Sequence, residues 1–160
     1  MTARIEIIQP KKLVGKRMTM SYADYKIAQL WGSFMPGRKH IHHPLTNDLI
    51  GLTIYKPDHF TNFRPTNEFE KWASVEVADF DRIPADMETC ILSGGLYAVF
   101  HYKGSSVEIA AFYRNIFEDW LPNSNYTLAE RPHVEVMGEK YKNNNPESEE
   151  EIWIPVQPIA

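Results

Sequence analysis

The chain has 160 residues, of which 43% are hydrophobic and 24% are charged, as expected for a single packed domain. Its formal net charge is −4, from 17 basic and 21 acidic residues, whereas nucleic-acid-binding proteins usually carry a basic excess. No apolar segment approaches the ~20 residues of a membrane-spanning helix, so neither a nucleic acid nor a membrane is expected as a direct partner.

The first half of the chain reads as strand, helix, strand, strand. Residues 4–22 have an extended pattern. Ser21 and Asp24 then form a pair similar to a capping box, ahead of apolar residues at helical spacing and a Pro-Gly stop. Two strands are predicted next, at 49–56 and 70–79.

The second half repeats this order. Residues 90–104 look extended around a Gly-Gly bend at Gly94 and Gly95. A second capped helical stripe covers 105–120, and alternating patterns predict strands at 131–141 and 149–157.

The repeated order predicts an α+β fold made of tandem duplicated β-α-β-β modules. We expect one domain, residues 1–160, with pseudo-repeats at about 1–83 and 84–160. Each module contributes an antiparallel sheet, and the sheets surround a central groove with the helices on the outer face. The alternative is a generic α+β domain whose element order repeats by chance.

Cys90 is the only cysteine, which excludes an intrachain disulfide. A single thiol is typical of a reducing compartment, and the N-terminus has no apolar signal core. These features favour a cytoplasmic location.

Strand alternation predicts which side chains share a face. If the apolar phase of each strand faces the helices, the helix-distal face collects aromatic and acidic residues. Aromatic faces attract cations, and a carboxylate supplies the counter-charge. We therefore expect a groove for a flat, lipophilic cation, although the aromatics could instead close a second small core. The residues on this predicted face are Tyr55, Trp72, Tyr97, His101, Glu135, Glu151 and Trp153.

Four segments of the second half carry a family resemblance: GGLYAVFHYKG, DWLPNSNY, RPHVEVMGEKY and EIWIPVQP. In order and spacing they resemble the gyrase-inhibitor-like effector-binding domains, which include the ligand-sensing halves of AraC-type and multidrug-responsive MerR-type regulators. The first half matches more loosely, through KLVGKR, GLTIYKP and WASVEV. The resemblance implies a tandem β-α-β-β fold whose central groove binds hydrophobic, often cationic, compounds.

The resemblance also implies a set of ligand-binding residues. Glu135 matches the glutamate of the penultimate strand that neutralises the cation. Val134 and Met137 depart from the family pattern, which often has Phe and Tyr there, and the flexible Met137 side chain still suits varied ligands. The chain begins in its first strand without a helix-turn-helix, so we expect a stand-alone member, similar to proteins of mobile gene cassettes. The ligand-binding residues predicted with Glu135 are Tyr55, Trp72, Tyr97, Trp153, Glu151 and Met137.

Two other functions remain open at this point. Glu135 or Glu151 could activate water to hydrolyse a strained electrophile, with Tyr97 as the acid. A gyrase-inhibitor-like interaction through the acidic surface would instead need a protein partner, which the sequence does not identify. Binding is favoured over catalysis because no acid and base stand at a fixed spacing.

No cofactor or metal is expected. The segment KHIHHP places His40, His42 and His43 together, and imidazoles can hold a transition metal. A solvated loop is the preferred interpretation, because only Asp48 stands nearby as a further ligand. No P-loop, GxGxxG or GxSxG motif occurs, and no catalytic residue is assigned.

Overall fold

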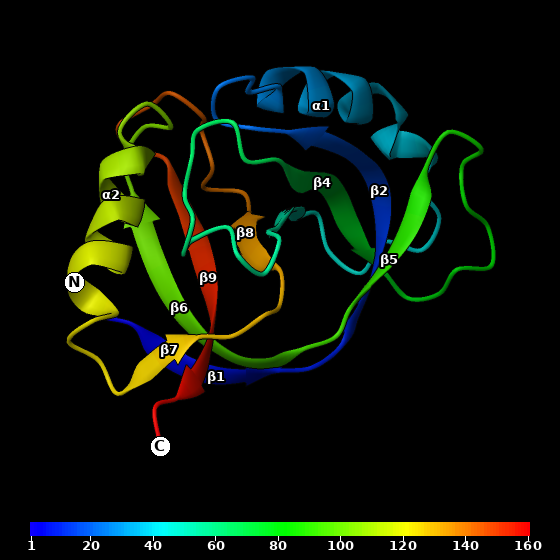
Figure 1. The fold of residues 1–160 in the computed structure, drawn as a ribbon. Coiled ribbons are helices and arrows are strands. Elements are labelled where there is room, and N and C mark those ends of the chain that lie inside the picture. The colour runs from blue at the N-terminus through cyan, green and yellow to red at the C-terminus, as the bar shows by residue number, and fades with distance from the viewer.

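The structure is a computed structural model that describes residues 1–160 as nine strands, all in antiparallel pairs, and two helices (Figure 1). No helix is long and apolar enough to cross a bilayer. The first-half elements are β1 (Arg4–Ile8), β2 (Lys11–Met20), α1 (Ile27–Phe34) with a 3-10 turn (Met35–His40), β3 (Leu49–Ile54) and β4 (Phe69–Val77). The second-half elements are β5 (Glu88–Leu92), β6 (Gly95–Lys103), α2 (Ile109–Asn115) with a π-helical turn (Ile116–Trp120), β7 (Tyr126–Leu128), β8 (His133–Met137) and β9 (Glu149–Pro158).

The strand order is symmetric about the contact between β3 and β8. The order is β1-β6-β9-β8-β3-β4-β2-β5, and β7 pairs with β9 outside this path. If β1 is exchanged with β5, β2 with β6, β3 with β8 and β4 with β9, the result is the same strand order read from the other end. This confirms the predicted duplicated α+β fold. The repeat bounds at 1–83 and 84–160 stay a prediction.

A Gly-Gly bend lets β5 and β6 serve both halves. Gly94 and Gly95 have φ of 77° and 128°, in the range that favours glycine. A Cβ at Gly94 would lie 2.4 Å from the carbonyl oxygen of Ile8, so only glycine fits this crossing. Before the bend, β5 pairs with β2. After the bend, β6 pairs with β1 and β9. Figure 1 shows the continuous stretch of β5 and β6 along the lower side of the molecule.

Both helices pack on one face of the sheet. Leu30 and Phe34 of α1 are buried in one core with Ala73 of β4. Ile116, at the end of α2, is buried in another core with Ile152 of β9. Ala73 pairs with a residue of β3, that residue pairs with one of β8, and the β8 residue pairs with Ile152. Ala73 and Ile152 therefore lie in one cross-strand row and point to the same side of the sheet.

The opposite face has a core of its own. Leu52 of β3, Val134 of β8 and Leu13 of β2 are buried there together with large aromatic side chains. The two central strands are therefore buried on the face that the helices do not cover. Their aliphatic residues point away from the helices, whereas those of β4 and β9 point toward them.

Candidate ligand-binding cleft

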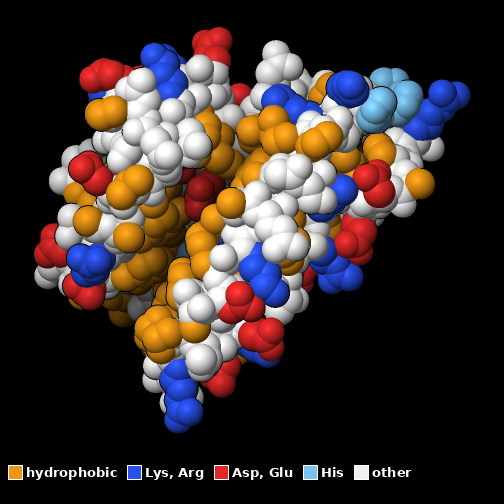
Figure 2. All heavy atoms as spheres, turned by 90° about the horizontal axis from the view of Figure 1, so that it is seen from above, with side chains coloured by type: hydrophobic (Ala, Val, Ile, Leu, Met, Phe, Trp, Pro, Cys, Tyr) orange, Lys and Arg blue, Asp and Glu red, His pale blue; other side chains and the backbone are white.

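The middle of the helix-bearing face is left uncovered. Ala73 pairs with Gly51 of β3, and Gly51 pairs with Glu135 of β8. Glu135 in turn pairs with Ile152. Helix α1 packs over the Ala73 end of this row and α2 over the Ile152 end, so Gly51 and Glu135 lie between the helices. Figure 2 shows a cleft here between the two halves, with mostly hydrophobic walls and an acidic side chain recessed in it.

Gly51 keeps the floor of the cleft open. A Cβ at this position would lie 3.6 Å from Cζ2 of Trp31, 3.7 Å from Cε of Met137 and 3.8 Å from Cβ of Glu135. Trp31, Met137 and Glu135 therefore surround one point of the floor. Sequence analysis named Met137 and Glu135 as ligand contacts but not Trp31.

Glu135 is held by two polar contacts from different elements. The Tyr113 hydroxyl of α2 donates a hydrogen bond of 2.9 Å to Glu135 Oε1. Lys71 Nζ of β4 lies 3.9 Å from the same oxygen. The Glu135 side chain remains 27% exposed, so the carboxylate is partly desolvated yet open to the cleft.

Tyrosines surround the Glu135 carboxylate. Burial raises the pKa of each of them, and the negative charge of Glu135 raises the pKa further. They stay neutral at physiological pH and leave the carboxylate as the charge among aromatic rings. The tyrosines are Tyr22, Tyr25, Tyr55, Tyr113 and Tyr141.

Further aromatic rings continue the wall from α2 to the segment after β3. The Phe117 centroid lies 5.4 Å from that of Phe60, and Phe60 lies 4.8 Å from Tyr55. His133 lies 4.9 Å from Tyr55 in an edge-to-face arrangement. Phe60 and Phe63 keep 43% and 54% of their surface exposed. Exposed aromatic rings beside a cleft are typical of a binding surface.

A second carboxyl group, Glu150 of β9, lies beside Glu135. Only 6% of Glu150 is exposed, and its Oε1 has no hydrogen-bond partner. Burial, followed by the charge and hydrogen bonding of Glu135, raises the pKa of Glu150 to about 8, although Lys71 opposes the shift. Glu150 is thus mostly protonated at neutral pH.

His133 does not add a positive charge to the cleft. Burial lowers its pKa to about 3, and the nearby Lys71 and His59 contribute to the same shift. The imidazole is neutral at physiological pH. It acts here as one more aromatic ring.

Five of the seven residues predicted for the helix-distal face do face away from the helices, but Tyr55 and Glu135 lie on the helix-bearing face, so the predicted position of the groove on the helix-distal face is wrong. Met137, predicted separately as a ligand contact, also lies on the cleft face, in the same strand phase as Glu135. The error arose because Leu52 and Val134 point away from the helices, whereas the prediction placed the apolar phase of every strand toward them. The residues on the opposite face are Trp72, Tyr97, His101, Glu151 and Trp153.

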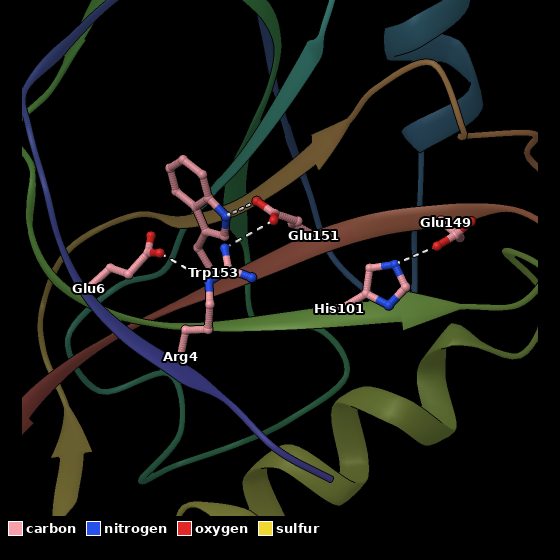
Figure 3. Close-up of polar contacts among 6 residues, drawn as sticks. All are labelled: Arg4, Glu6, His101, Glu149, Glu151 and Trp153. Carbon is pink, nitrogen blue, oxygen red and sulfur yellow. Dashed lines mark hydrogen bonds and ion pairs between the residues drawn. The ribbon is translucent and has the colours of Figure 1, made fainter.

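The side chains on the helix-distal face have their own partners there, away from the cleft. Figure 3 shows Trp153 Nε1 donating to Glu151 Oε1 at 3.1 Å, while Arg4 donates to Glu151 Oε2 at 3.1 Å. His101 Nε2 lies 2.7 Å from Glu149 Oε1.

Two further aromatic side chains of that face are also satisfied there. The Tyr97 hydroxyl donates to the Pro132 carbonyl at 2.8 Å, and Trp72 Nε1 donates to Glu70 at 2.8 Å. Tyr97 and Glu151 therefore lie on the opposite face of the sheet from Glu135.

Sequence reasoning missed three polar residues of the cleft, and two of them carried a usable signal. Glu150 continues the phase of Ile152 and Ile154, which was correctly assigned to the helix-bearing face. Tyr113 stands four residues after Ile109, an apolar residue of the predicted helix and the first residue of α2. Lys71 had no comparable signal.

The loop histidines lie far from this arrangement in the fold. His40, His42 and His43 are exposed near the end of the 3-10 turn, and His43 Nδ1 lies 3.1 Å from Asp79 Oδ2. No group of three or more His, Cys, Asp or Glu side chains is placed to hold a metal ion.

Comparison with known families and structures gives a consistent result. A family model described as the GyrI-like small molecule binding domain matches residues 1–157. No curated protein matches the chain.

Similar solved structures cover nearly the whole chain, and three of them illustrate the likeness. The structure of SAV2435 bound to tetraphenylphosphonium has a TM-score of 0.68 at 19% identity, covering 98% of this chain and 94% of that chain. An integron cassette protein from Vibrio cholerae has a TM-score of 0.66 at 17% identity, covering 98% and 96%. The EcmrR C-terminal domain has a TM-score of 0.67 at 17% identity, covering 99% and 98%. At these identities the likeness concerns the fold.

Proposed function

Because the chain belongs to the GyrI-like small-molecule-binding domain family, we propose that its cleft binds lipophilic organic cations, with Glu135 as the counter-charge. The protein would act as a sensor or sequestering protein for such compounds. One observation carries the proposal: the Glu135 carboxylate lies among neutral aromatic rings, fixed by the Tyr113 hydroxyl at 2.9 Å.

This arrangement suits a ligand that is both apolar and positively charged. A cation over an aromatic face gains roughly 0.5–2 kcal/mol, with the larger values at desolvated sites. The partly exposed Glu135 carboxylate supplies the opposite charge in a site of reduced dielectric. A neutral apolar compound would gain ring contacts but no attraction to the carboxylate.

The comparisons support the same ligand class. SAV2435, which is similar in fold, is bound to tetraphenylphosphonium, a large apolar cation. Carrying that ligand class over to this chain is part of the proposal, since the two chains share 19% identity.

A pair of ligands that differ in charge but little in shape tests the proposal. Methyltriphenylphosphonium and triphenylphosphine oxide share three phenyl rings, and only the first is a cation. Isothermal titration should give the cation at least ~10-fold higher affinity, equivalent to ~1.4 kcal/mol. Equal affinities would count against a charge-selective cleft.

One observation favours a second candidate function, hydrolysis of an electrophilic small molecule. A protonated Glu150 beside Glu135 and Tyr113 offers an acid and a base within one site. Structures described as hydrolases from Listeria innocua are similar in fold, with TM-scores of 0.60 and 0.59.

Hydrolysis can be tested directly with an aryl epoxide such as styrene oxide. If the cleft hydrolyses electrophiles, the wild type forms diol faster than buffer does, and Glu135→Gln reduces that rate. Diol formation at the buffer rate would leave binding as the function.

A further inference from the structure

We propose that the cleft exchanges a proton for its ligand: Glu150 is protonated in the empty cleft and releases its proton when a cation binds beside Glu135. The inference rests on the proposed function of cation binding. It adds to that function a second acidic residue and a dependence of affinity on pH.

The position of Glu150 makes an ionised carboxylate unfavourable in the empty cleft. Glu150 pairs with Tyr102 of β6. It stands two residues before Ile152 in β9 and therefore lies on the same face, the cleft face. It is 94% buried, and its Oε1 accepts no hydrogen bond. A buried carboxylate without a donor is favoured in its neutral, protonated form.

The groups that face Glu150 come from several elements, and two of them carry charge. Glu135 of β8 is the neighbouring carboxylate, and Lys71 of β4 is the cation that contacts it at 3.9 Å. The remaining groups are the neutral tyrosines Tyr102 of β6, Tyr113 of α2 and Tyr141 of the segment between β8 and β9.

A count of charges indicates when the proton leaves. With Glu150 neutral, Lys71 balances Glu135 and these three groups have no net charge. A bound monovalent cation adds one positive charge, which ionised Glu150 balances. A buried site favours this balance, since unpaired charge is costly there.

The titration behaviour of Glu150 supports the geometry. Burial and the adjacent Glu135 raise its pKa to about 8, so at pH 7 Glu150 is protonated in the empty cleft. A cation placed beside the two carboxyl groups acts in the opposite direction and lowers the pKa of Glu150.

Titration of tetraphenylphosphonium into the wild type tests this exchange, because the charge of this probe is permanent. The binding enthalpy is measured at pH 7 in phosphate and in Tris, whose ionisation enthalpies differ, to count released protons. We expect close to one proton released per cation. The dissociation constant should fall nearly tenfold from pH 6 to pH 7 and become constant above pH 8.

Glu150→Gln keeps the shape of the side chain but cannot titrate, so it should abolish both the proton release and the pH dependence of affinity. Glu151→Gln is the matched control, since Glu151 is the next residue on the opposite face, and it should behave like the wild type.

Binding by the wild type without proton release would overturn the exchange while leaving the proposed function intact. Proton release that persists in Glu150→Gln would also overturn it, because another group would then be the donor. Failure of the wild type to bind the probe at any of these pH values would contradict the proposed function and the exchange together.

Discussion

Lys71 Nζ and Glu135 Oε1 lie 3.9 Å apart above β3, which separates their strands in the sheet. The pair joins a cation from the first half of the chain to a carboxylate from the second. Its side chains are only 11% and 27% exposed, so their attraction is less screened than that of a surface ion pair. Lys71 therefore competes with any cationic ligand for the Glu135 carboxylate.

Removal of this competitor should strengthen ligand binding. Lys71→Met keeps an apolar stem of similar length but leaves the Glu135 carboxylate without its cation. We expect tetraphenylphosphonium to bind roughly 3- to 10-fold more tightly, measured by isothermal titration.

Lys11→Met is the control for this substitution. Lys11 forms an ion pair of 3.6 Å with Glu76 on the opposite face of the sheet, so its loss should leave affinity unchanged. Weaker binding by Lys71→Met would indicate that Lys71 supports the ligand site instead of competing for it.

The contribution of Glu150 to folding stability should decrease as the pH rises from about 4.5 to about 8. The pKa of Glu150 is about 8 in the folded protein and 4.5 as its ordinary value, so the folded state binds more protons between these pH values. Stability from Glu150 is therefore lost as pH rises through this window, with a slope of up to ~1.4 kcal/mol per pH unit. His133 has the opposite effect, but only below its ordinary pKa of 6.5.

Urea unfolding between pH 6.5 and pH 8.5 isolates the contribution of Glu150. The wild type should lose stability across this range, and Glu150→Gln should lose less and be the more stable protein at pH 8. Parallel stability curves for the two proteins would show that Glu150 titrates normally in the folded state.

Trp31 should report ligand binding through its fluorescence. Its indole lies at the floor of the cleft, 3.6 Å from the position of a Gly51 Cβ, whereas Trp153 points to the opposite face. Tetraphenylphosphonium should quench the wild type, and Trp31→Phe should remove most of that quenching. Trp153→Phe should retain it; the reverse pattern would place the ligand on the opposite face.

The fold could be predicted from sequence because its signals are local. Alternation located β4, β6, β8 and β9, and the Gly-Gly signal located the bend at Gly94 and Gly95. The pair Ser21 and Asp24 also forms its predicted contact, with the Asp24 amide donating to Ser21 Oγ at 3.0 Å. The helix itself begins later, at Ile27, so the pair stabilises the preceding turn.

The candidate site could be predicted only in part because it depends on which face each strand buries. Alternation separates Glu135 from Val134 but does not say which of them faces the helices. In β8 both faces are buried or half-buried, so the apolar residue does not mark the helix side. Lys71 reaches Glu135 only through the order β4-β3-β8, which is a property of the tertiary fold.

The central claim is that Glu135 is the counter-charge for a cation bound in the cleft. Isothermal titration of tetraphenylphosphonium into the wild type, Glu135→Gln and Glu151→Gln tests it most directly, because the two glutamates lie on opposite faces of adjacent strands. The account predicts that Glu135→Gln lowers affinity by roughly tenfold or more and that Glu151→Gln binds like the wild type. Unchanged affinity in Glu135→Gln, or a loss confined to Glu151→Gln, would contradict it.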